Sequence, residues 1–103
     1  MTSADAQFAE VLDTFSANKW SVTFTTGHIA RLEHHKQVGG YIRRKKSITN
    51  KVDARASVEL SPNGKWELRL VNWLTETTPE AKSDYLKAVR QLKKAGVPVF
   101  SNL

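Results

Sequence analysis

Apolar residues recur at helical spacing near both ends of the chain and alternate with polar residues in two stretches between them. A first helix is predicted over residues 3–17 because four residues have the i, i+3, i+4, i+7 spacing of an amphipathic helix: Phe8, Val11, Leu12 and Phe15. Ser3 can cap this helix, and Asn18 can stop it in a left-handed conformation. The segment WSVTFTT, residues 20–26, then alternates apolar and polar positions, which predicts a half-buried strand.

The middle of the chain alternates less clearly, and we interpret it as two helices. In residues 26–37 a strand would place Ile29 on one face with charged and polar residues, whereas a helix capped by Thr26 gathers an apolar side: Ile29, Ala30 and Leu32. Residues 38–48 also have helical spacing at four positions: Val38, Tyr41, Ile42 and Lys45. Gly39 and Gly40 weaken this second helix, and a strand is its alternative.

A hairpin and a last helix follow. The sequence Ser61-Pro62-Asn63-Gly64 places proline and glycine where a type I turn with a bulge needs them. It separates two alternating runs: Val58 and Leu60, then Trp66, Leu68 and Leu70. Thr78, Pro79 and Gly96 mark the cap, the first residue and the end of a helix with an apolar face: Ala81, Tyr85, Ala88, Val89 and Leu92. The tail after it either completes the core as an edge strand or forms a homodimer contact with the last helix.

The chain is long enough for a single modest core, so its length indicates one domain over residues 1–103, and the order of predicted helices and strands makes this domain α+β. The chain has no cysteine, which excludes disulfides and thiolate metal sites. It has no run of eighteen apolar residues, and its first residues do not show a basic stretch followed by an apolar one. We therefore expect a cytoplasmic protein without membrane contact. The three tryptophans, Trp20, Trp66 and Trp73, are assigned to the core.

The formal net charge of +6 is concentrated in one segment. From His28 to Arg55 eight Lys and Arg residues stand against Glu33 and Asp53, and the rest of the chain is neutral. A basic face on a neutral body is typical of a protein that binds a polyanion.

The order helix, strand, two helices, hairpin, helix resembles that of a winged helix-turn-helix DNA-binding domain, over about residues 20–73. FTTGHIARL, residues 24–32, looks like the start of the first motif helix. VGGYIRRKKSI, residues 38–48, stands in the position of the recognition helix, and SPNGK, residues 61–65, in that of the wing tip. The chain departs from the family in lacking the glycine of the turn and in opening its recognition helix with two glycines. The alternative fold is an α-β-β-β-α sheet with flanking helices.

The chemistry of the basic segment predicts which residues contact DNA. An arginine can bond guanine in a bidentate way, so Arg43 and Arg44 are expected to read bases, while the lysines neutralise phosphates. Gly39 and Gly40 either let backbone N–H groups approach a phosphate or serve the loop geometry alone. The resemblance implies wing contacts from Asn63 and Lys65. The full set of predicted DNA-binding residues is Thr26, His35, Lys36, Gln37, Gly39, Gly40, Tyr41, Arg43, Arg44, Lys45, Lys46, Lys51, Asn63 and Lys65.

Other activities have less support in the sequence. The histidines His28, His34 and His35 lack the spacing of metal ligands, so no metal or cofactor is expected. The chain has no nucleophile elbow, no P-loop spacing and no carboxylate cluster, so we expect no enzyme. The expected function is non-catalytic, sequence-specific or semi-specific binding of duplex DNA, by a small transcriptional regulator or a phage- or plasmid-type accessory factor that acts as a monomer or as a homodimer. Two alternatives stay open: an inhibitor or adaptor that binds an acidic protein, and an RNA-binding α/β module.

Overall fold

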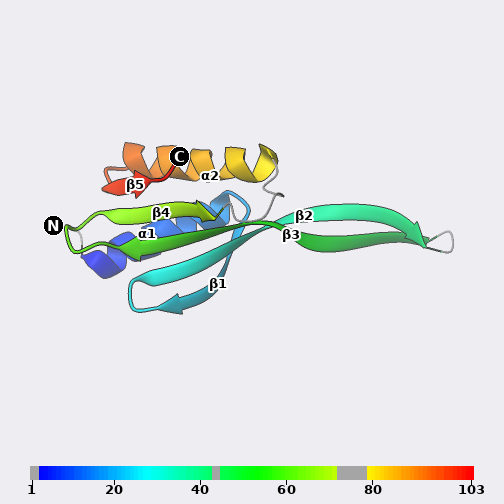
Figure 1. Ribbon diagram of the computed structural model, residues 1–103, viewed down its shortest axis with the longest axis horizontal. Helices are drawn as coiled ribbons and strands as arrows, with labels where there is room; N and C mark the ends of the chain where they lie inside the picture. Colours follow the sequence, from blue (N-terminus) through cyan, green and yellow to red (C-terminus); the bar gives the residue numbers. More distant parts are fainter. Residues whose placement is uncertain (1–2, 43–44, 72–78) are drawn as a thin grey trace.

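The computed structural model describes residues 3–42, 45–71 and 79–103, with the backbone alone for residues 36–42 and 45–50. Its elements in chain order are α1 (Ala4–Ala17), β1 (Trp20–Thr26), β2 (Ile29–Ile42), β3 (Lys45–Leu60), β4 (Trp66–Val71), α2 (Pro79–Lys94) and β5 (Val99–Ser101). The strands form one sheet in the order β1-β2-β3-β4-β5, antiparallel except for β5, which runs parallel to β4. Figure 1 shows both helices beside one end of this sheet.

α1 forms where the apolar spacing predicts it. The Ser3 hydroxyl oxygen accepts a hydrogen bond from the Ala6 N–H at 3.1 Å and so caps the helix. At the other end Asn18 is the cap, and its side-chain amide donates to the Thr14 carbonyl at 2.8 Å. The residue in the left-handed conformation is Lys19, with a φ of 70°, and not Asn18 as predicted.

The two helices predicted for residues 26–37 and 38–48 are wrong, and with them the winged helix-turn-helix layout. Gly27, with a φ of 54°, and His28 form a two-residue turn between the paired residues Thr26 and Ile29, so the chain reverses into a second strand. Strands therefore replace both motif helices. The fold is nearer to the α-β-β-β-α alternative, to which it adds β4 and the short β5.

β2 does alternate, but one of its buried positions is a histidine. Ala30, Leu32 and His34 are buried, whereas Arg31 and His35 are exposed. A pattern that counts histidine as polar does not detect this period of two. Helix propensities differ by only a few tenths of a kcal/mol per residue, which burial of one face of a strand outweighs.

The predicted hairpin and the predicted last helix are confirmed. β3 and β4 form the predicted hairpin around the turn at Ser61, and Gly64 has the positive φ that this turn needs. The predicted inner face of α2 is buried: Ala81, Tyr85, Ala88, Val89 and Leu92. The tail completes the sheet as an edge strand, β5, so the apolar face of α2 is already used inside the chain. Thr78 and Trp73 lie outside the described residues.

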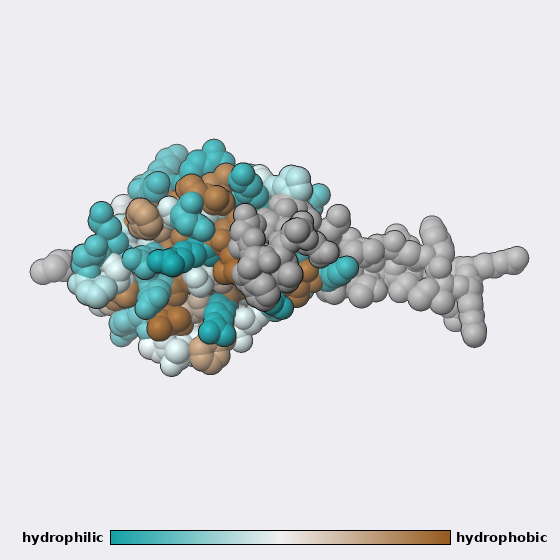
Figure 2. Space-filling model, in the orientation of Figure 1, coloured by the Kyte–Doolittle hydropathy of each residue, from teal (hydrophilic) through white to brown (hydrophobic). Residues whose placement is uncertain are grey.

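The core lies between the two helices and one face of the sheet. Phe15 of α1 contacts the rings of Trp20 and Tyr85, and Phe8 stacks on Trp66 with ring centroids 5.4 Å apart. Trp20 and Trp66 are thus core residues, as predicted. Hydrophilic side chains gather over α2 on the outside of this body (Figure 2). Neither described helix has the length and apolar character needed to cross a membrane.

A candidate nucleic-acid interface on a β-hairpin arm

The β2–β3 hairpin is much longer than the body that supports it. It continues beyond both helices as a two-stranded ribbon (Figure 1), and the molecule measures 57 Å along this direction but only 24 and 23 Å across. We call residues 36–51 the arm. At about 3.3 Å per residue, the seven residues of β2 from Lys36 to Ile42 extend about 23 Å. Most of the excess length of the molecule is therefore arm.

The arm carries the whole net charge of the protein. It contains six of the sixteen Lys and Arg residues and none of the ten Asp and Glu residues, so the remaining ten basic and ten acidic residues balance. Its cations are Lys36, Arg43, Arg44, Lys45, Lys46 and Lys51. Charge and shape thus coincide: the neutral part is the packed body, and the cationic part is the ribbon outside it.

Backbone pairing sets the positions of the arm residues against each other. Lys36 pairs with Lys51, Tyr41 with Lys46 and Ile42 with Lys45, while Gly39 and Gly40 pair with Ile48 and Ser47. Like charges placed directly opposite each other in a ladder are destabilising. The Lys36–Lys51 pair is therefore a position where a bound anion would relieve repulsion.

The structure brings nine of the fourteen predicted DNA-binding residues together at the arm or its base. These nine are His35, Lys36, Gln37, Gly39, Gly40, Tyr41, Lys45, Lys46 and Lys51. They come from two paired strands and not from the predicted recognition helix. Arg43 and Arg44, between the paired residues Ile42 and Lys45, lie outside the described residues.

The other three predicted residues lie at the opposite end of the body. Thr26 ends β1 at the turn before β2, and Asn63 and Lys65 belong to the β3–β4 turn. The Leu60 N–H donates to the His28 carbonyl at 3.1 Å, which joins these two turns far from the arm. The Asn63 side-chain oxygen accepts from the Lys65 N–H at 3.1 Å, so it serves the turn itself. The structure does not bring these residues to the basic segment.

The sheet face opposite the helices is balanced in charge. Arg55 Nε lies 3.2 Å from a carboxylate oxygen of Glu33, and Arg69 lies 3.6 Å from Glu67. The Arg31 guanidinium lies over the Phe24 ring, 5.7 Å from its centroid. This face therefore adds no concentration of positive charge to that of the arm.

At the base of the arm the structure contains a cluster that the sequence interpretation missed. His34 Nδ1 lies 2.7 Å from a carboxylate oxygen of Asp53, and His34 Nε2 lies 2.8 Å from one of Asp84. The imidazole is only 2% exposed, and the Trp20 ring contacts it edge-on with centroids 5.2 Å apart. Two ionised carboxylates are acceptors only, so both contacts are hydrogen bonds when both ring nitrogens carry a proton.

A signal for this cluster exists in the sequence. Asp84 falls on the apolar face of α2, between Ala81 and Ala88, where an unpaired carboxylate would be costly. Such a position indicates a buried partner, although the sequence does not name it. The three histidines do not form one site: His28 contacts Asp5 at 2.7 Å on the surface, His34 is buried, and His35 is exposed.

No protein-family model, no curated protein and no solved structure matches this chain. Its function is therefore inferred from its residues and their geometry.

Proposed function

We propose that the protein binds duplex DNA without catalysis, with its arm in a groove of the duplex and the arm cations against phosphates. The observation that carries this proposal is that the whole net charge lies on the segment that projects beyond the core. Phosphate neutralisation by Lys and Arg supplies most of the affinity of such proteins and lets them associate quickly. Because the body is balanced in charge, the arm would supply the phosphate contacts.

The shape of the arm favours DNA over double-stranded RNA. The major groove of B-form DNA is about 12 Å wide and admits a two-stranded β-ribbon, whereas the major groove of an A-form RNA helix is deep and narrow. Gly39 and Gly40 fit this role because a strand glycine permits close approach of another backbone. Arg43 and Arg44 are our candidates for base contacts, and Lys45, Lys46 and Lys51 for phosphate contacts.

The test is fluorescence anisotropy of labelled duplex DNA, single-stranded DNA and double-stranded RNA, each at several salt concentrations. We expect duplex DNA to bind most tightly. If six cations neutralise phosphates, the logarithm of the association constant falls against the logarithm of salt with a slope of about −5.

A matched pair of variants locates the interface. Replacing four arm residues by Gln (Arg43, Arg44, Lys45 and Lys46) should reduce the slope to about −2 and weaken binding strongly. The control removes the same number of charges from the exposed side of α2, at Lys82, Lys87, Arg90 and Lys94, and should leave the slope near that of the parent. Equal losses of affinity in both variants would mean that positive charge anywhere on the protein supports binding, and that the arm has no special part in it. Absence of binding to any nucleic acid at low salt would overturn the proposal in favour of an acidic protein partner.

Within the arm, single substitutions separate base reading from phosphate contact. Arg43→Ala or Arg44→Ala should relax sequence preference among duplexes, while Lys46→Ala should weaken all duplexes alike and reduce the slope by about one. Equal effects of all three on every duplex would show that no base is read.

A further inference from the structure

The cluster of His34, Asp53 and Asp84 joins three elements at the level where the arm begins. His34 belongs to β2, Asp53 to β3 and Asp84 to α2. In the β2–β3 register His34 pairs with Ala54 and His35 pairs with Val52, so Asp53 is the extra residue of a β-bulge. A bulge bends its strand and increases the local twist, and so it sets the direction of the ribbon that follows.

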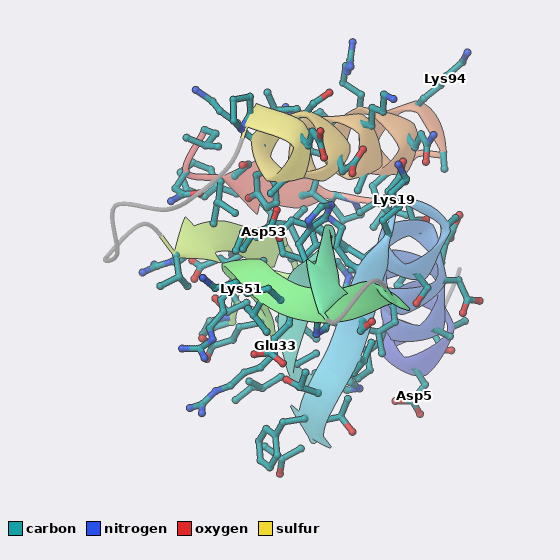
Figure 3. The ribbon with its side chains drawn as sticks, turned by 90° about the vertical axis from the view of Figure 1, so that its right-hand side faces the viewer. Asp5, Lys19, Glu33, Lys51, Asp53 and Lys94 are labelled. Atoms are coloured by element: carbon teal, nitrogen blue, oxygen red, sulfur yellow. The ribbon has the colours of Figure 1, made fainter. Side chains whose placement is uncertain are left out.

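This level is also the boundary of the packed body. Among the side chains that the structure describes, His34 is the last buried residue of β2, and its neighbour His35 is exposed. Figure 3, viewed along the arm, shows Asp53 on the side of the sheet that faces α2 and Glu33 on the other side. The Asp53 side chain is 7% exposed and that of Asp84 12%. The cluster is thus a nearly dry connection between the arm base and α2.

Stability alone does not account for such a cluster. Removing three ionisable groups from water is costly, and apolar residues of similar volume often replace a buried ionic group with no loss of stability. Hydrogen bonds differ from apolar contacts in being directional. A ring held on both nitrogens, by one residue of the bulge and one of a helix, has a single orientation between them.

We propose that His34, Asp53 and Asp84 are positioning residues that fix the direction in which the arm leaves the body. His34 links the bulge of β3 to α2, and the bulge directs the ribbon. An arm held in one direction meets a groove without first having to be ordered, which lowers the cost of binding. The consequence for DNA affinity rests on the proposed function, whereas the anchoring of the arm does not.

The anchoring can be measured as a distance distribution between arm and body. Because the chain has no cysteine, Ser47→Cys on the arm and Lys87→Cys on the exposed side of α2 place two spin labels at defined positions. Pulsed electron paramagnetic resonance then reports the distances between them. The parent chain should give one narrow distribution.

The decisive variant replaces the whole cluster: His34→Leu, Asp53→Val and Asp84→Leu together. We expect the melting temperature of this variant to be at least that of the parent, while the width of its distance distribution at least doubles. Asp84→Asn, which retains an acceptor in nearly the same shape, serves as a second and milder variant and should widen it less. The control His35→Leu changes the exposed neighbour and should leave the width unchanged.

The outcomes separate anchoring from binding. A folded triple variant whose distribution stays as narrow as that of the parent would overturn the proposal. If instead the arm spreads and holds the productive direction about a tenth of the time, the apparent dissociation constant for duplex DNA rises about tenfold. If the distance distribution broadens in the triple variant but the parent protein binds no nucleic acid, the anchoring is supported and only the proposed function is refuted. Broadening without any change in duplex affinity would refute the link between direction and binding.

Discussion

The two halves of the β2–β3 hairpin belong to the same pair of strands, but the bulge at Asp53 separates them and their environments differ. In the half nearer the turns, Ala30 and Leu32 of β2 and Ala56 and Val58 of β3 are buried under the helices. In the arm the same two strands continue to pair as a ribbon without a helix above it (Figure 1). The first half carries two cations against three acids, and the second half carries six cations and no acid. The comparison thus separates a packed body, which holds the fold together, from a cationic ribbon, to which we assign the proposed binding function.

The cluster at the boundary should give the largest effect on stability. His34→Ala leaves two buried carboxylates without the imidazole between them, so we expect the free energy of unfolding to fall by about 3–5 kcal/mol. His35→Ala, at the exposed neighbour next to the arm, is the control and should change this free energy by less than about 0.5 kcal/mol. Urea denaturation followed by tryptophan fluorescence measures both. A small effect at His34 would mean that the cluster contributes little to holding the body together.

A smaller loss is expected where the tail closes the sheet. The Asn102 side chain extends the β5 pairing: its amide donates to the Leu70 carbonyl at 3.1 Å, and its oxygen accepts from the Leu70 N–H at 3.0 Å. Removing two part-buried hydrogen bonds by Asn102→Ala should cost about 1–2 kcal/mol. Leu103→Ala, at an exposed neighbouring residue, should cost little, and comparable losses in the two would argue against this role of the amide.

Tyr85 gives the body a dependence on alkaline pH. Burial raises the pKa of its phenol above 10.0, while the 2.7 Å hydrogen bond with the Ser101 hydroxyl acts in the opposite direction. The unfolded chain therefore loses this proton first as the pH rises past 10, and stability falls. Tyr85→Phe should cost about 1 kcal/mol at neutral pH, from the lost hydrogen bond. It should also weaken the decline in stability as the pH rises through about 10 and above in denaturant titrations. If stability declines with pH in Tyr85→Phe as steeply as in the parent, other titratable groups cause the decline.

The same comparison explains which parts of the molecule could be predicted from sequence. Elements with one strong period and standard end signals were predicted correctly: α1, the β3–β4 turn with its proline and glycine, and α2. β2 was not predicted, because its buried positions include His34, which a hydropathy pattern counts as polar. Charge located the basic segment within a few residues, but only the strand pairing shows that its cations lie on a ribbon. The buried cluster depends on contacts between residues 19 and 50 positions apart, and a local pattern does not contain them.

The smallest expected change in stability lies within the arm, where stability and binding should respond in opposite directions. Lys51→Glu replaces the like charges of the Lys36–Lys51 pair by opposite charges, which should raise the free energy of unfolding by about 0.2–1 kcal/mol. The same change removes a cation and adds an anion beside the DNA, so duplex affinity and its salt slope should both fall. Lys51→Gln, the neutral control, should fall between the parent and Lys51→Glu in both measurements. A gain in stability together with a loss of affinity would indicate that the repulsion between Lys36 and Lys51 is retained in the free protein because the partner is an anion. If Lys51→Glu lowers stability and affinity together, the distal ribbon contributes to the fold, and the division between body and arm does not hold at this position.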